Sequence, residues 1–539
     1  MIRSLIRQNI PHKMSLPFNH KRTQTLYDPE LQETSSKIRK LDLDLTSCST
    51  DSDTKNNNNS IKRQTCIAYY MQRDNRIKDN WAYIYAQNCA VEQKLPLLVI
   101  NEIYFPEHEP SATLRTLEFK IAGLKAVTKE CKRLNVKFEL LIGSNNYRKK
   151  SALTRFLKTN ENYKIKELVV DFSPLKPFRK TFLEKLIKFL KNEGNGYFKD
   201  FTTLTQVDAH NVVPVWEASN KREYAARTIR PKITAKLGTF LKNFPELTPL
   251  EHKFESKTAK IDCESYQSLF KNTVDQSVKT SDLYQPGPEA GLAMLNDFIN
   301  NRMKKEGYST NRNNPTKPGA LSNLSPWLHH GQISSQKCAM EIKKSSNKNK
   351  KEDIDAFIEE AIVRSELSDN FCYYCDDYDN LKGGYDWAQN SLDLHREDER
   401  EYLYTLKELD KSKTHDNLWN AAQKQLVHEG KMHGFLRMYW AKKILEWTAS
   451  PEQALSFSLH LNDRYSLDGN DSNGFTGCMW SIVGVHDNGW PERKVFGKIR
   501  FMNYDGCKRK IKKEPLLKFE EKYRKIGREQ KIEKFLVKK

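Results

Sequence analysis

Three tryptophans in the C-terminal half have a spacing that could support electron transfer. Trp440 and Trp447 are seven residues apart, so on one helix they share a face and lie about 10 Å apart along its axis. Trp419 falls on the preceding helical segment, which could pack beside them. Large aromatic side chains at helical spacing usually form a packed core. The alternative is an electron-hopping chain, because indole is among the most easily oxidised side chains.

Two polar segments lie on either side of these tryptophans and have the composition of cofactor-binding loops. Residues 462–477 (NDRYSLDGNDSNGFTG) combine three glycines with several Asp and Asn residues, which is too polar for a core and too glycine-rich for a helix. In residues 319–331 (GALSNLSPWLHHG), Ser322 and Ser325 precede Pro326, as at the start of a helix. Hydroxyl and N–H groups there can hold a phosphate. A surface loop and a plain helix cap remain the alternative interpretations.

The N-terminal half must supply a different kind of scaffold, because short apolar runs alternate there with helical patterns. Runs of this length, rich in β-branched residues, are typical of buried parallel strands. They lie at residues 66–71, 95–100, 138–143, 167–172 and 212–216, with helical periodicity after 77, 114 and 182. The pattern predicts a Rossmann-like parallel α/β fold with helices on both faces of the sheet. No GxGxxG motif follows the first run, so the usual dinucleotide site is not predicted.

From Glu289 to Leu461 the pattern is largely helical, and the QPGP run at 285–288 marks a boundary near Pro286. The sequence thus predicts five regions: a disordered extension over 1–62, an α/β domain over 63–216, an interdomain linker over 217–285, an all-helical domain over 286–507 and a basic tail over 508–539.

The chain of 539 residues carries 90 basic and 69 acidic side chains, a formal charge of +21 that favours a polyanionic partner, nucleic acid first. The tail contributes +9 of it, from 14 basic and 5 acidic residues. That tail could attract phosphates or be a solvated appendage.

Scattered cysteines and the absence of a long apolar run predict an intracellular protein, nuclear or cytoplasmic, without a membrane span. Cys372 and Cys375 have no second pair to complete a zinc site, so no metal is predicted. Basic residues, and no acidic ones, precede Asp28, which leaves a transit peptide as the alternative to a floppy terminus.

The order of these pieces resembles the class II cyclobutane-pyrimidine-dimer photolyases, over about residues 64–507. The likeness rests on long motifs: 70–86 (YMQRDNRIKDNWAYIYA), 208–216 (DAHNVVPVW), 223–232 (EYAARTIRPK), 357–374 (FIEEAIVRSELSDNFCYY), 431–447 (KMHGFLRMYWAKKILEW) and 487–500. The resemblance implies an α/β antenna-type domain followed by a helical domain that holds FAD. It also implies UV-damaged DNA as the partner, action as a monomer, and leaves room for a second antenna chromophore of unknown identity.

The resemblance also implies roles for individual residues. Those expected to contact FAD are Tyr308, Ser322, Leu324, Ser325, Arg437, Asn462, Asp468 and Asn470, with Arg437 and Asp468 as an ion pair beside the isoalloxazine. Asn462 would lie near flavin N5, because the later position used by more distant photolyases is Gly474 here. Those expected to contact the lesion or the DNA are Glu360, Met438, Trp480, Trp490 and Arg500. Trp419, Trp440 and Trp447 match the electron relay.

The implied reaction is light-driven: reduced FAD gives an electron to a pyrimidine dimer, the cyclobutane ring opens, and the electron returns. Glu360, if protonated or hydrogen-bonded, could stabilise the developing dimer anion, whereas a buried, unpaired carboxylate would repel it. Two other functions remain open. One is a cryptochrome-like photoreceptor without repair activity, against which Glu360, Met438 and Trp480 argue. The other is a basic DNA-binding protein without a cofactor.

Overall fold

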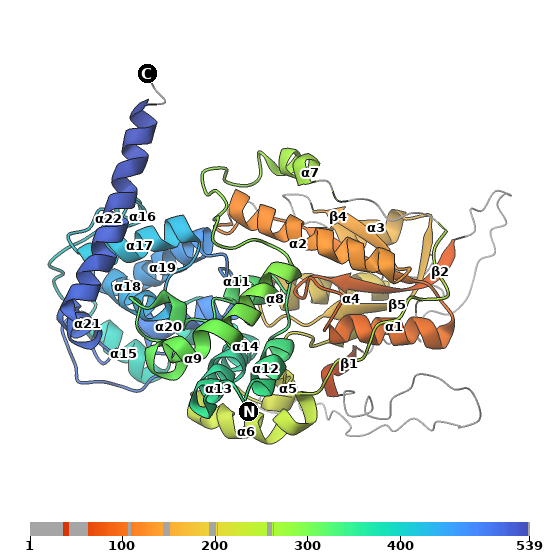
Figure 1. Ribbon diagram of the computed structural model, residues 1–539, viewed down its shortest axis with the longest axis horizontal. Helices are drawn as coiled ribbons and strands as arrows, with labels where there is room; N and C mark the ends of the chain where they lie inside the picture. The colour runs from red at the N-terminus through yellow and green to blue at the C-terminus, as the bar shows by residue number, and fades with distance from the viewer. Residues whose placement is uncertain are drawn as a thin grey trace, which may run out of the picture.

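A six-stranded sheet forms the centre of the N-terminal unit (Figure 1). The computed structural model describes residues 36–41, 63–105, 109–143, 151–192, 201, 203–255, 261 and 263–536. The strands are β1 (Ile38–Leu41), β2 (Gln64–Met71), β3 (Leu97–Ile103), β4 (Lys137–Ile142), β5 (Tyr163–Asp171) and β6 (Thr203–Val207), in the order β1-β6-β5-β2-β3-β4. Strands β2 to β6 pair in parallel, which confirms the predicted Rossmann-like fold.

Helices cover both faces of this sheet, as the continuous apolar runs predict. They are α1 (Trp81–Gln93), α2 (Leu114–Arg133), α3 (Ala152–Thr159) and α4 (Glu184–Asn192), the last preceded by the π-helical turn η2 (Pro177–Leu183). Ile67 and Tyr69 of β2 face α1 and α2, whereas Cys66 and Ala68 face α3 and α4. This alternation is the period of two expected of a strand buried on both sides.

The run at 212–216 does not form the predicted strand. Its last residues begin α5 (Val215–Ala218), after Pro214, which lacks an N–H group and suits a helix start. The N–H groups of Val212 and Val213 donate instead to Oε1 of Glu366, at 2.7 and 3.1 Å. The run therefore joins the two halves of the protein rather than extending the sheet.

The prediction of a disordered extension over 1–62 is wrong at β1. This strand pairs antiparallel with β6, so it adds an edge that the parallel pattern did not include. The neighbouring Lys37 is buried, and its ammonium donates to the carbonyl oxygens of Asn211 and Val212 at 2.7 and 2.8 Å. Residues 1–35 and 42–62, including the segment considered as a transit peptide, lie outside the described residues.

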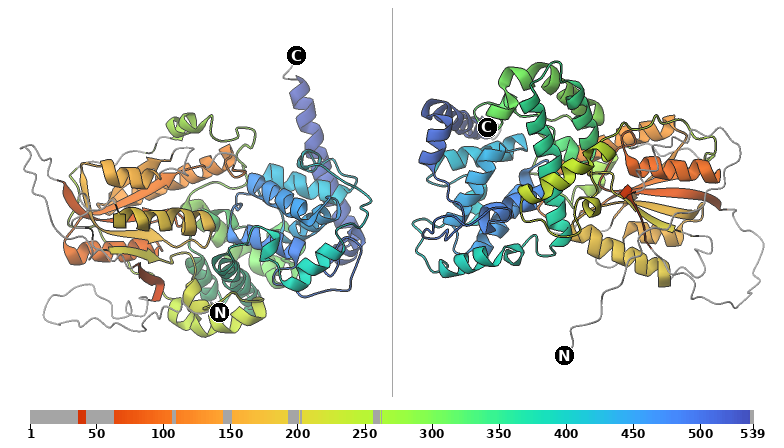
Figure 2. Two further views of the ribbon diagram at one scale, coloured as in Figure 1. Left: turned by 180° about the vertical axis from the view of Figure 1, so that it is seen from behind. Right: turned by 90° about the horizontal axis from the view of Figure 1, so that it is seen from below.

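The C-terminal unit is helical, as predicted, and lies beside the α/β unit (Figure 2). Its helices are α8 (Pro288–Asp297), α9 (Met303–Glu306), α10 (Tyr308–Asn311), α11 (Ser325–His329), α12 (Ser335–Lys344), α13 (Lys351–Ile358), α14 (Ser365–Tyr374), α15 (Asp386–Leu394), α16 (Leu406–Asp410), α17 (Asn417–Glu429), α18 (Gly434–Glu446), α19 (Pro451–Tyr465) and α20 (Ser472–Val483). Two π-helical turns, η3 (Phe298–Arg302) and η5 (Glu359–Arg364), and two 3₁₀ turns, η4 (Pro318–Ala320) and η6 (Leu381–Gly383), complete it.

The predicted linker over 217–285 contains two helices, α6 (Ala226–Phe240) and α7 (Cys263–Phe270). Ile229 and Ile233 of α6 are buried in one apolar cluster with Ile362 and Val363 of η5. Burial of this kind ties α6 to the helical unit. The region predicted as a linker is therefore partly helical and packed. The limits of the five predicted regions remain predictions.

The basic tail forms α21 (Tyr504–Ile511) and α22 (Lys513–Leu536), and the end of α22 projects away from the body (Figure 1). The first half of α22 packs against α17, with Leu516, Phe519 and Tyr523 buried in the core of the helical unit. This half is therefore not the solvated appendage considered from the sequence. Residues 537–539 lie outside the described part. Over the described helices, no segment combines the length and apolarity needed to cross a bilayer.

Candidate active site

Helix α18 passes through the middle of the helical unit, between α17, α19 and α20. It follows the polar turn 431–433 and begins at Gly434, where Nδ1 of His433 accepts a hydrogen bond from the N–H of Phe435 at 3.1 Å. Most of its residues are buried, and the buried residues lie on every side of the helix. A helix in this position can present different side chains to several neighbouring sites.

Arg437 of α18 pairs with Asp468 from the loop after α19, with Nη2 and Oδ1 3.2 Å apart. Although burial opposes ionisation, Arg437 and Lys431 keep the pKa of Asp468 below its ordinary value. Lys431 donates from Nζ to Oγ of Ser325 at 2.8 Å, and burial lowers its pKa to about 8. The structure therefore brings the predicted ion pair to the predicted phosphate segment, with Lys431 as the link.

The remaining donors around this pair fit a bound flavin. Within the described chain, Nε of Arg437 is a buried N–H group without an acceptor. A ligand with carbonyl or phosphate oxygens would supply one. Leu324 and Tyr308 are buried nearby in one cluster, and the Tyr308 ring packs on Phe298 at 5.3 Å. This donor set suits FAD.

Asn462 is buried on α19, and its side-chain N–H donates to Oδ1 of Asp463 at 2.9 Å. A Cβ added to Gly474 would lie 2.9 Å from the Asn462 amide nitrogen, so a side chain at 474 would collide with it. This contact agrees with the expectation that Asn462 takes the role that the residue at position 474 has in more distant photolyases. Asn470 donates to Oγ of Ser111 at 3.4 Å and lines the cavity between the two units.

The three predicted relay tryptophans form one buried stack, with 0–2% of each side chain exposed. The rings of Trp440 and Trp419 are parallel, 6.2 Å apart between centroids, and those of Trp419 and Trp447 meet edge-on at 5.9 Å. Trp440 donates to Gln423 at 2.9 Å and Trp419 to the carbonyl of Trp440 at 3.0 Å, so both indole N–H groups are satisfied.

A pocket of about 870 Å³ opens beside α18 and brings four of the five predicted DNA contacts together with Arg437. Those contacts are Met438, Trp480, Trp490 and Arg500. The rim is strongly basic; besides Arg437 and Arg500, its charged residues are Arg364, Arg493, Arg509, Lys510 and the acidic Asp487. An apolar-walled pocket with a cationic rim suits a base that leaves the duplex while its phosphates stay outside.

One side of this pocket is built from stacked cations and indoles. The guanidinium of Arg500 lies 4.0 Å from the ring centroid of Trp490 and 5.7 Å from that of Trp480. Its Nε and Nη2 donate to the two carboxylate oxygens of Asp487 at 2.8 and 2.9 Å. Trp490 is 39% exposed, so its ring is held in place yet accessible.

Glu360 departs from the expected geometry. It lies in the π-helical turn η5 and pairs with Arg312 at 2.8 Å, with 38% of its side chain exposed. The carboxyl group is thus neither buried nor unpaired, because Arg312 compensates its charge in a half-open position. Glu360 lies in the same turn as Arg364, which lines the pocket, but does not itself line it.

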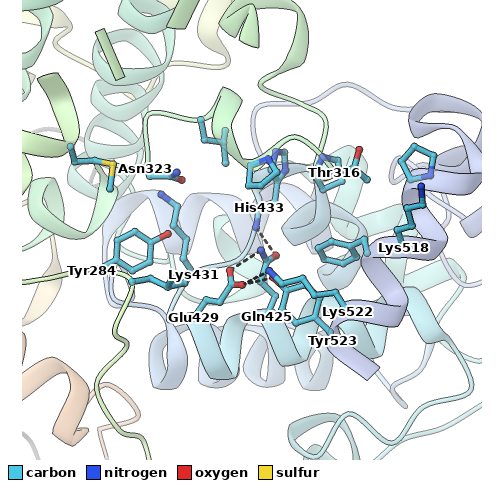
Figure 3. Close-up of a pocket in the computed structure, with 17 residues that line it drawn as sticks. Tyr284, Thr316, Asn323, Gln425, Glu429, Lys431, His433, Lys518, Lys522 and Tyr523 are labelled. Atoms are coloured by element: carbon cyan, nitrogen blue, oxygen red, sulfur yellow. Dashed lines mark hydrogen bonds and ion pairs between the residues drawn. The ribbon is translucent and has the colours of Figure 1, made fainter. Parts of the chain in front are cut away.

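Two buried lysines beside these groups were not singled out from the sequence. Lys431 also borders a cavity of about 570 Å³ between the segment after η4 and helix α22, where it points toward Asn323 (Figure 3). Lys442 of α18 is buried behind Trp480. Both stand inside the 431–447 motif, but burial of a lysine gives no sequence signal.

The α/β unit, the helical unit with its flavin-type donor set and the cationic pocket together define the photolyase and cryptochrome fold. The model of the family described as DNA photolyase matches residues 67–250. The chain is 47% identical to the deoxyribodipyrimidine photo-lyase of Potorous tridactylus over 83% of its length and 79% of that protein. It is 46% identical to the same enzyme of Arabidopsis thaliana, over 83% and 86%. The chain belongs to the DNA photolyase family.

Solved structures agree in fold. A bacterial class III photolyase from Agrobacterium tumefaciens superposes with a TM-score of 0.61 at 17% identity, covering 86% of this chain and 88% of that one. A cryptochrome from Synechocystis gives 0.59 at 13% identity, covering 83% and 86%.

Proposed function

We propose that this protein is a deoxyribodipyrimidine photo-lyase that uses light and FAD to split cyclobutane pyrimidine dimers in UV-damaged DNA into monomers. One observation carries the proposal: Arg437, half of the ion pair assigned to the flavin, lines the same cationic pocket as Met438 and Trp480. The pocket thus offers an aromatic wall for a flipped lesion directly beside the flavin donors. The 47% identity to a photo-lyase supports it.

The residues assigned to FAD would hold its phosphates at Ser322 and Ser325 and its ring system beside Arg437 and Asp468. When bound and excited in its reduced form, FAD supplies the electron that opens the cyclobutane ring. Arg437 places a cation beside that ring system, and Asp468 holds the guanidinium in orientation at 3.2 Å. The apolar faces of Met438 and Trp480 exclude water from the lesion.

Glu360 would contact the dimer from the pocket edge. In the free protein Nη1 of Arg312 lies 2.8 Å from Oε1 of Glu360 and fixes the position of this carboxyl group. The tryptophan stack would carry electrons inward in the order Trp447, Trp419, Trp440, since consecutive rings are 5.9 and 6.2 Å apart.

Arg500 and Trp490 would occupy the space that the lesion leaves in the duplex. The basic rim would bind phosphates, so affinity should fall as salt rises. We also propose that the protein acts as a monomer. A second chromophore is also part of the proposal, but the cavity of about 710 Å³ between the two units is not assigned to it, because Asn470, an expected FAD contact, lines that cavity. Mass analysis of released chromophores tests for the second chromophore.

The decisive experiment illuminates purified, flavin-reduced protein with DNA that contains a cyclobutane dimer. Loss of dimers that depends on blue light supports the proposal. Intact dimers, with a preparation that was yellow with flavin absorbance before reduction, would refute it and favour a photoreceptor. Absence of flavin absorbance would refute the FAD site itself.

A further inference from the structure

The wall of the lesion pocket rests on a buried cation. Lys442 of α18 is 0% exposed and lies behind Trp480, with its Nζ 4.5 Å from the indole ring centroid. The same ammonium donates to the carbonyl oxygen of Ser481 at 2.7 Å. A cation over the face of an indole is attracted to its π electrons, more strongly when water is excluded. Trp480 is thus held from the side opposite the ligand.

We propose that Lys442 is a positioning residue of the lesion pocket, whose ammonium fixes the Trp480 wall and makes the preference for dimer-containing DNA depend on pH. This inference rests on the proposed function, since it takes the pocket as the lesion site. Lys442 acts through Trp480 and has no direct contact with the ligand.

Two oppositely charged groups face Lys442. Asp487 and Arg500 act on it from the loop after α20, and they form the paired carboxylate and guanidinium described above. Although burial opposes ionisation, Arg500 keeps the pKa of Asp487 below its ordinary value. Lys442 and Arg500 thus leave one net positive charge beneath the pocket at low pH. That charge would attract a polyanionic ligand.

The other titratable groups of this wall do not change charge in the same range. Burial lowers the pKa of His486, which lines the pocket, to about 3, so this ring is neutral at pH 7. Burial raises the pKa of the Cys478 thiol of α20 and of Cys507 of α21 to about 12. By contrast, burial lowers the pKa of Lys442 to about 7, while Asp487 opposes that shift.

The direction of the pH effect follows. Below about pH 7 Lys442 carries its proton and holds the indole; as pH rises through 7 to 8 the proton is lost, and with it the attraction to the ring. Because DNA is a polyanion, its binding would favour the charged lysine, so the change should occur somewhat above 7 in the complex. Lesion preference should therefore be highest at low pH.

The test compares Kd in the dark for plain duplex and for the same duplex with one cyclobutane dimer, from about pH 6 to pH 8.5. The ratio of Kd for plain duplex to Kd for dimer-containing duplex measures the preference for the lesion. Charge effects that are common to all DNA cancel in this ratio. We expect the wild-type ratio to fall about tenfold across this range. Lys442→Met should give a low ratio at every pH, and Lys442→Arg a high one, because arginine stays charged.

Lys120→Met is the matched control. Burial lowers the pKa of Lys120 to about 8, and its Nζ donates to the carbonyl of Glu102 at 3.2 Å, but it lies on α2 in the α/β unit. Its pH profile should equal that of the wild type. A Lys442→Met protein that follows the wild-type profile would overturn the inference.

If both Lys442 variants fail to fold, Trp480→Leu provides the second test. It removes the ring and leaves the lysine, so the ratio should lose its pH dependence; retention of the wild-type profile would overturn the inference. A wild-type protein without dimer preference at any pH, and without light-dependent loss of dimers, would instead refute the proposed function.

Discussion

Replacement of Trp490 by alanine should weaken binding of damaged DNA far more than it destabilises the protein. The ring is 39% exposed at the pocket rim, and Arg500 lies over one face at 4.0 Å. Losing that contact at an exposed site costs about 0.5–1 kcal/mol of folding free energy. A base stacked on an aromatic ring contributes about 1–3 kcal/mol to binding. At about 2 kcal/mol, Kd for a dimer-containing duplex should rise roughly thirtyfold.

Fluorescence anisotropy with labelled duplexes, in the dark, measures this effect. The Kd for undamaged duplex should rise less, because no base is displaced and the rim cations still bind phosphates. Tyr402→Ala is the control, since Tyr402 is 38% exposed but does not line the pocket. A Trp490→Ala protein whose Kd for damaged DNA changes less than twofold would refute the placement of Trp490 in the duplex gap. An equal rise in Kd for both duplexes would also refute this placement.

Four further outcomes are expected. Trp440→Phe should abolish photoreduction of oxidised flavin, followed by absorbance, while repair by prereduced enzyme continues; loss of both would contradict the relay. Glu360→Ala should lower the quantum yield of repair about tenfold or more, leaving Arg312 without its carboxylate partner and the fold intact; an unchanged yield would count against its role. Phe519→Ala should cost about 3 kcal/mol and speed hydrogen exchange in α22, whereas unchanged exchange would show that the helix is held elsewhere. Arg509→Ala should reduce the salt slope of DNA binding by about 1; an unaltered slope would remove it from the phosphate-binding rim.

The sequence predicts local features and their order well. Alternating apolar runs predict the parallel sheet, because strands buried on both faces need apolar residues at every position. Trp440 lies in α18 and Trp447 directly follows the end of that helix, and both rings contact Trp419 of α17, as the helical pattern predicts. The Arg437–Asp468 pair, 31 residues apart, is implied by the family resemblance and is formed.

Features that depend on distant partners were not predicted. The run at 212–216 has strand composition, yet Glu366 binds its N–H groups from the helical unit. β1 belongs to the sheet only because β6 offers a free edge. Glu360 pairs with Arg312, the residue that directly follows α10, and the sequence does not reveal this partner. In each case the deciding contact joins residues far apart in the chain, where periodicity carries no information.

Helix α18 contributes a side chain to the ion pair, to the pocket and to the tryptophan stack, so the geometry of all three is coupled. Successive residues on a helix point about 100° apart, so neighbours along α18 face different partners. Arg437 meets Asp468, Met438 enters the pocket, Trp440 stacks on Trp419, and Lys442 reaches behind Trp480. A single inserted residue before Arg437 would turn all of these side chains away at once, whereas four inserted residues would nearly restore their directions and shift them by about 6 Å. Ion pair, lesion wall and relay therefore depend on one register, which the helix start at Gly434 fixes.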